Sequence, residues 1–146
     1  MRGTKEPLIV IGDSDGLIAL LHEDDFHHLR AKKTVQNLIQ HDAQVIFPMT
    51  SIVETITTLT RKLEKPILAT LVVHKITHGE LAIETADAPL LEAALKVFNP
   101  IGSKQNTLFD AFVVATAKKF KTNYVFSFDQ WYQKQGLHFA SDLSEV

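Results

Sequence analysis

Short runs that are apolar throughout recur along the chain, separated by longer segments of mixed character. The runs are Leu8–Ile11 before Gly12, Val45–Phe47 before Pro48, 81–83, Tyr124–Phe126 and 138–139. Runs of this length, rich in β-branched or aromatic residues and closed by glycine or proline, are typical of buried strands. We therefore expect a strand at each of them, the one at 81–83 being the weakest by composition.

The segments between the runs carry apolar residues three or four positions apart, the spacing of one helix face. Asp87 is placed to cap a helix, and Pro66 and Pro89 stand where a first helical turn tolerates proline. The expected helices cover 16–21, 24–41, 51–63, 66–78, 87–98, 107–120 and 129–135. Strands that alternate with helices and are apolar on both faces predict an α/β fold with a parallel sheet covered on both sides.

Composition narrows the class of protein without naming a function. A chain of 146 residues, 45% hydrophobic and 22% charged, fits a single domain spanning 1–146. The absence of cysteine excludes disulfide scaffolds and thiolate zinc sites, so we expect a cytoplasmic protein. Asp13 and Asp15 interrupt the first apolar run, which argues against a signal peptide or a membrane span. A net charge of −2 gives no strong basic field.

Four acidic residues are predicted to lie at the same edge of the sheet. Asp13 directly follows the first strand, and Asp129 follows the Tyr124–Phe126 strand. Glu54 and Asp110 are expected in the first turns of their helices. In parallel α/β sheets the carboxyl ends of strands and the starts of helices share one edge, where ligands bind. The four carboxylates are therefore expected to converge there.

Asp110 gives the sharpest reason to expect a cation. Val113, Val114 and Ala117 lie three, four and seven positions after it, so its side chain starts from the buried helix face. A buried carboxylate without a partner costs several kcal/mol or becomes neutral. Clustered carboxylates repel one another unless a cation lies among them, and hard divalent ions such as Mg²⁺ or Mn²⁺ prefer oxygen ligands.

Each acid also has a plainer interpretation. Ser51 to Glu54 and Thr107 to Asp110 have the spacing of capping boxes, in which the acid satisfies backbone N–H groups. Asp13 and Asp129 can cap the helices that follow them. Taken one at a time, these interpretations compete evenly with metal binding. The convergence of all four acids on one predicted edge favours the metal site.

In this order the segments resemble those of PIN domains, and especially the small VapC-type toxin ribonucleases. The motifs that carry the resemblance are Ile11–Ile18 with Asp13, Pro48–Glu54, Thr107–Ala117 with Asp110, and Phe126–Asp129. They span nearly the whole chain in the family's order, and the ordered set is more specific than any single motif.

The sequence departs from the family's pattern at two positions. Asp15 adds an acid where members commonly have a small or polar residue, and only Lys104 stands for the basic residue often found before the third acid.

The resemblance implies a PIN-like three-layer sandwich with about five parallel strands, acting as a Mg²⁺- or Mn²⁺-dependent endoribonuclease. It implies Asp13, Glu54 and Asp110 as metal ligands, with Asp129 binding directly or through water. Ser14 and Ser127 would support these acids by hydrogen bonds, and Lys104 would contact the RNA. The family also implies a homodimer and an antitoxin partner, for which the apolar helices between 51 and 78 offer surfaces. Plain core packing is the alternative for those helices.

Two other functions fit parts of the sequence. Asp13-Ser14-Asp15-Gly16 after an apolar strand also looks like the opening of haloacid-dehalogenase phosphatases, with Asp13 as nucleophile and Asp15 as general acid. That interpretation leaves Asp110 without a role. A non-catalytic PIN-like module that binds RNA or protein is the other alternative. His74 and His78 have a zinc-binding spacing without an obvious third ligand, so we interpret them as ordinary helix residues.

Overall fold

The structure of the protein is a computed structural model that describes residues 6–102 and 105–146. Five parallel strands form a sheet in the order β3-β2-β1-β4-β5. The strands are β1 (Ile9–Gly12), β2 (Gln44–Pro48), β3 (Ala82–Glu84), β4 (Tyr124–Phe126) and β5 (His138–Phe139). In the centre Ile11 pairs with Ile46 on one side and with Val125 on the other. Because every neighbouring pair is parallel, the carboxyl ends of the strands share one edge.

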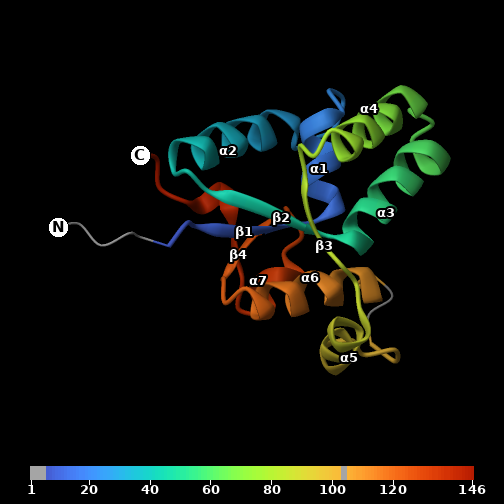
Figure 1. Cartoon of the computed structure of the whole chain (residues 1–146), viewed down its shortest axis with the longest axis vertical. Coiled ribbons are helices and arrows are strands. Elements are labelled where there is room, and N and C mark those ends of the chain that lie inside the picture. The colour runs from blue at the N-terminus through green and yellow to red at the C-terminus, as the bar shows by residue number, and fades with distance from the viewer. Residues whose placement is uncertain (1–5, 103–104) are drawn as a thin grey trace.

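Helices cover both faces of the sheet, which gives three layers (Figure 1). One layer holds α1 (Ser14–Leu21), α2 (His28–Gln40), α3 (Met49–Thr57) and α4 (Pro66–Thr77), with a π-helical segment at Thr58–Lys62 after α3. The other layer holds α5 (Ala88–Val97), α6 (Leu108–Lys119) and α7 (Trp131–Lys134). The α/β, PIN-like three-layer arrangement expected from the sequence is confirmed.

The central strand β1 supplies both halves of the core because its side chains alternate between faces. Val10 packs with Ala19 and Leu38 in the α1–α2 layer, and Ile11 packs with Val113 and Val125 against α6. Val10 and Ile11 are fully buried. Burying an aliphatic side chain of this size stabilises a fold by about 1.5–3 kcal/mol. The strand that precedes Asp13 is thus fixed from above and below.

Gly16 brings the start of α1 against β4. A Cβ atom at this position would collide with the carbonyl oxygen of Phe126. The same approach lets the Asp13 N–H donate to the Phe126 carbonyl at 3.1 Å. A larger residue at Gly16 would push α1 away from β4 and separate Asp13 from the residues that follow that strand.

Several predicted boundaries were wrong by a few residues. The helix expected from Asp24 begins at His28, because Asp25 closes turns with the backbone of His22, His27 and His28. The buried positions of α2 are Ala31, Thr34 and Leu38. Three apolar residues expected at helical spacing are exposed instead, namely Phe26, Leu29 and Ile39.

Two boundary shifts affect the candidate acids. α3 begins at Met49, directly after Pro48, so Glu54 lies in its second turn and not in the first. No side chain caps the start of α3, which rules out the capping box suggested for Ser51 and Glu54. The last helix is shorter than expected and begins at Trp131, two residues after Asp129.

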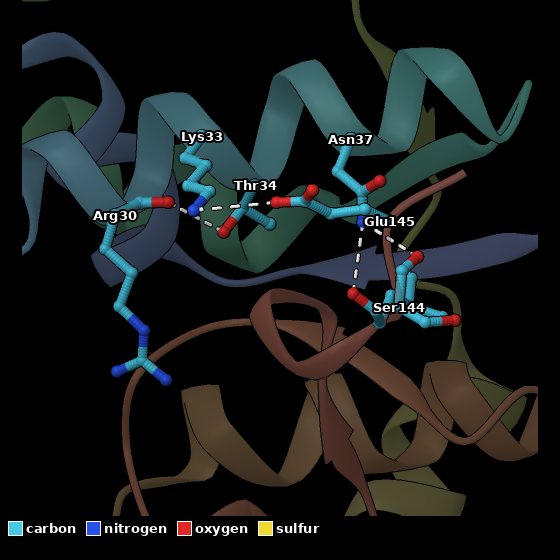
Figure 2. Close-up of polar contacts among 7 residues, drawn as sticks. Arg30, Lys33, Thr34, Asn37, Ser144 and Glu145 are labelled. Carbon is cyan, nitrogen blue, oxygen red and sulfur yellow. Dashed lines mark hydrogen bonds and ion pairs between the residues drawn. The ribbon is translucent and has the colours of Figure 1, made fainter.

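The C-terminal residues run along α2 (Figure 2). The Asn37 side-chain amide donates to the carbonyls of Leu143 and Ser144 at 3.2 and 3.3 Å. Lys33 lies 3.5 Å from Glu145, and both side chains are largely exposed. Within the described ranges, no helix combines the length and the apolar character needed to cross a membrane.

Candidate active site

Asp13 is the most deeply placed acid of the sheet edge, with only 3% of its surface exposed. One carboxylate oxygen accepts the Ser14 N–H at 2.7 Å, so the expected capping role is present. The other oxygen accepts the Tyr132 hydroxyl at 2.6 Å. Tyr132 is itself fully buried beneath this edge. Asp13 is therefore held in place through both oxygens.

The Tyr132 hydroxyl also joins Asp13 to Asp110. Its oxygen lies 3.3 Å from Oδ1 of Asp110, compared with 2.6 Å from Asp13. A phenol has one proton, so the hydroxyl donates mainly to Asp13, at the shorter distance. Oδ1 of Asp110 lies near the hydroxyl but receives only a weak hydrogen bond from it. Oδ2 of Asp110 accepts the Thr107 N–H at 2.9 Å, which is the predicted capping contact. The cap uses one oxygen and leaves the other directed at the cluster.

Asn106 joins Asp110 to Asp129. Its side-chain nitrogen is 3.4 Å from an oxygen of each carboxylate, and an amide has a proton for both. The second oxygen of Asp129 accepts the Trp131 N–H at 2.9 Å, which ties it to the start of α7. Asp129 thus resembles Asp110 in having one oxygen in a local backbone contact and one toward the other acids.

Glu54 reaches the same edge from α3. Its carboxylate accepts a short hydrogen bond from the Ser14 hydroxyl, and Ser14 directly follows Asp13. The expected supporting role of Ser14 is therefore consistent with its geometry. This contact brings Glu54 into line with the other three acids although α3 starts earlier than expected.

Asp15 connects the β1–α1 turn to the segment after β4. Its Oδ2 accepts the Ser127 hydroxyl at 2.9 Å and the Phe128 N–H at 2.8 Å. The Ser127 oxygen in turn accepts the Asp129 N–H at 3.1 Å. The extra acid and Ser127 together fix the backbone that presents Asp129. The role of Asp15, which the family pattern did not explain, is therefore to hold this backbone segment in place.

The environment of the edge raises the pKa values of Asp13, Glu54 and Asp110. Burial raises the pKa of Asp13 well above its usual range, and the charges of Asp15, Asp110 and Glu54 raise it further, against the Tyr132 hydrogen bond. Burial likewise raises the pKa of Glu54 and of Asp110, with repulsion from Asp110 and Asp129 respectively adding to it. Among the described residues, no lysine, arginine or histidine forms an ion pair with these acids.

The donor chemistry fits a hard divalent cation, because every converging ligand is a carboxylate oxygen. Three acidic or histidine side chains close enough to hold an ion by themselves do not occur in the described part of the chain. Instead, protons of Tyr132, Asn106 and Ser14 stand between or beside the acids. These protons reduce the repulsion between the carboxylates. A cation bound here would need water molecules or small side-chain movements to complete its coordination shell.

The sequence found the four acids but missed two groups that connect them. The sequence around Tyr132 predicts only a short helix with aromatic residues. Nothing in its spacing indicates that the Tyr132 hydroxyl donates to Asp13. Asn106 precedes the helix cap Thr107 and looks like an ordinary loop residue. Ser14 and Ser127 were expected near the site and lie there. Lys104, proposed as an RNA contact, falls outside the described residues.

Comparison with known proteins agrees with this architecture. The family model for the PIN domain matches residues 10–135, most of the chain and all four acids. The crystal structure of VapC20 from Mycobacterium tuberculosis, described as a Sarcin-Ricin loop cleaving toxin, is similar with a TM-score of 0.77. The two are 19% identical, over 88% of this chain and 96% of VapC20. No curated protein is significantly similar in sequence. The family match removes the basis for the phosphatase alternative, and the chain belongs to the PIN domain family.

Proposed function

We propose that the protein is a Mg²⁺- or Mn²⁺-dependent endoribonuclease that hydrolyses RNA phosphodiester bonds at the acidic edge of its sheet. The observation that carries the proposal is the hydrogen-bonded chain from Glu54 through Ser14 to Asp13, and from Asp13 through Tyr132 and Asn106 to Asp110 and Asp129. These acids come from four separate segments and carry one sign of charge; Asp13 is buried and the other three are partly buried. Such an arrangement is stable near neutral pH when a cation compensates it.

In this proposal Asp13, Glu54 and Asp110 bind the cation, and Asp129 binds it directly or through water. A bound divalent ion supplies an activated water molecule and stabilises the negative charge of the phosphoryl transition state. The chain's contribution is to orient the ligands. Tyr132 holds Asp13, Ser14 holds Glu54, and Asn106 spaces Asp110 from Asp129. Fixed outer contacts of this kind typically change metal affinity or activity by about 10–100-fold when removed.

The partners follow the same proposal. RNA is the substrate in the cytoplasm, with the single domain 1–146 acting as the toxin of a toxin–antitoxin pair and forming a homodimer. The similarity of the fold to that of VapC20, a Sarcin-Ricin loop cleaving toxin, supports the RNA assignment. Exposed apolar side chains on α3 and α4 support the protein contacts; these are Met49, Val53, Ile67, Leu71 and Val73.

The test is a cleavage assay with purified protein on RNA that contains both hairpin loops and duplex segments. We expect cleavage with Mn²⁺ or Mg²⁺, no cleavage with EDTA, and none by Asp110→Asn. Lys32→Ala, a change on the exposed surface of α2, is the matched control and should cleave normally. Hydrolysis of small phosphoesters without RNA cleavage would contradict the proposal, and metal-independent RNA binding without cleavage would support the non-catalytic module.

A further inference from the structure

A cleft with a volume of about 590 Å³ lies beside Asp129. Ligand pockets in proteins commonly measure between about 300 and 1,000 Å³, so a nucleotide-sized ligand would fit. The cleft lies between the start of α2 and the segment that runs from β4 into α7. Its walls include His27, Arg30, Phe128, Asp129, Trp131 and Lys134. It therefore opens directly onto one of the four candidate acids.

Aromatic rings form one side of this cleft. The His27 ring stacks on Phe128 with centroids 4.4 Å apart and planes 14° from parallel. Phe128 contacts the core residue Phe126 edge-on, which anchors the stack. Phe26 meets the edge of His27 at 4.9 Å and is 94% exposed. An exposed aromatic ring, Phe26, therefore lies in contact with His27, a residue of the cleft wall that is itself held by Phe128.

Trp131 adds a further aromatic side chain to the wall of the cleft. It is half-buried and its ring meets that of Tyr132 at 5.3 Å, so it packs on the residue that holds Asp13. Stacking of a nucleobase on an aromatic side chain contributes about 1–3 kcal/mol and tolerates any base. Aromatic side chains that share a cleft with a candidate metal ligand are suited to bases that are not paired in a duplex.

Positive charge lines the same cleft. The Arg30 guanidinium lies 5.1 Å from the centre of the Phe128 ring, and its nearest acid is Asp142 at 3.8 Å. Both partners of that ion pair are about half exposed, and such pairs contribute little to stability. Figure 2 shows the Arg30 side chain extending away from the Lys33–Glu145 pair and the Asn37 contacts. Lys134 adds a second cation from α7. Arg30 can therefore turn to a phosphate at small cost.

We propose that this cleft is a subsite for an unpaired nucleotide of the RNA that flanks the cleaved bond. The base stacks on the exposed ring of Phe26, and the adjoining phosphate lies against Arg30 and Lys134. The inference rests on the proposed ribonuclease function and adds the residues that select unpaired RNA. A base within a duplex is stacked on its neighbours and cannot present its face to these rings.

The test measures binding separately from cleavage. Fluorescence anisotropy in EDTA gives the Kd of a short labelled single-stranded RNA and of its duplex for each variant. Phe26→Ala should raise the single-strand Kd by roughly 5-fold or more. Leu29→Ala, which removes another exposed apolar side chain from the same surface, should not. Arg30→Ala should lower the salt slope of log Kd by roughly 0.7, the value expected for one phosphate contact to a single strand. Lys32→Ala is its control.

Three results would overturn the subsite. They are no RNA binding by the wild type, equal effects of Phe26→Ala and Leu29→Ala, or an equal loss of duplex and single-strand binding in the cleft variants. A wild type that cleaves RNA with Mn²⁺ while Phe26→Ala and Arg30→Ala bind normally would end this inference and leave the proposed function standing. If the wild type binds single-stranded RNA at this cleft but never cleaves it, the proposed function is overturned and only a binding site for unpaired RNA remains.

Discussion

Charged side chains gather both on the surface of α2 and at the acidic edge of the sheet, but the two regions compensate charge differently. On α2, Arg30 and Lys33 face Asp142 and Glu145, with side chains that are 47–77% exposed. At the sheet edge the charges have one sign, and Asp13 is buried while the other three acids are partly buried. Described neighbours offer these acids hydroxyl and amide protons in place of cations. The first arrangement is complete by itself in water. In the proposed function, the second is completed by a cation from outside the chain.

The largest effect should follow from neutralising one acid of the edge. Asp110→Asn keeps the size and the capping acceptor for the Thr107 N–H but removes one charge. We expect Mn²⁺-dependent RNA cleavage to fall by more than about 100-fold, because even outer contacts of metal ligands are worth about 10–100-fold. Unfolding should stay cooperative by circular dichroism. Full activity in this variant would remove Asp110 from the site.

Metal should change stability in a pH-dependent way. The raised pKa values of Asp13, Glu54 and Asp110 mean that the folded state holds protons more tightly than the unfolded chain. Between the usual carboxyl pKa of about 4 and the raised values, the free energy of unfolding therefore falls as pH rises. Thermal unfolding in EDTA should show this fall.

Mn²⁺ at about 100 times its Kd should then add about 2.7 kcal/mol at neutral pH. The gain should shrink at acidic pH, where protons compete for the same oxygens. At the same Mn²⁺ concentration it should fall to about 1.4 kcal/mol or less in Asp110→Asn, whose affinity is expected to be at least about 10-fold weaker. An unchanged melting temperature on adding Mn²⁺ at neutral pH would show that the acidic edge needs no cation. The proposed difference between this edge and the surface of α2 would then be wrong.

A smaller effect is expected from the hydroxyl that links two acids. Tyr132→Phe removes only the group that holds Asp13 and leaves the buried ring in the core. We expect cleavage to fall by about 10-fold, with a stability change of about 1 kcal/mol. Tyr124→Phe, which removes a hydroxyl from β4, is the matched control. A loss of stability without any change in kcat or metal affinity would make Tyr132 a core residue alone.

The smallest effect belongs to α2. Lys33→Ala breaks the exposed pair with Glu145 and should cost about 0.5 kcal/mol or less in chemical denaturation. RNA cleavage should be unchanged. A cost comparable with that of Tyr132→Phe would mean that the C-terminal contacts of α2 contribute more than exposed ion pairs usually do.

The sequence predicted the sheet well because its strands are short and predominantly apolar. Its helix boundaries were less certain where local turns compete with periodicity. Asp25 turns the backbone before α2 and leaves Phe26 exposed, although the spacing of apolar residues continues through both. Glu54 illustrates the reverse case, since it reaches the expected edge from the second helical turn through Ser14.

The connections within the site could not be predicted for a different reason. Positions along strands and helices place acids at an edge, but they do not show which neutral groups stand between them. Tyr132 lies three residues after Asp129 and 119 positions after Asp13, to which it donates. Asp15 looked like an additional acid of the site, yet its contacts with Ser127 and Phe128 fix the backbone before Asp129. Such contacts depend on tertiary packing.

The most direct measurement is a Mn²⁺ titration of the wild type and of Asp110→Asn, followed by electron paramagnetic resonance at neutral pH. The account predicts saturable Mn²⁺ binding by the wild type and an affinity at least about 10-fold weaker in the variant. Equal affinities, or no saturable binding by the wild type, would contradict the claim that these acids are arranged around a divalent cation.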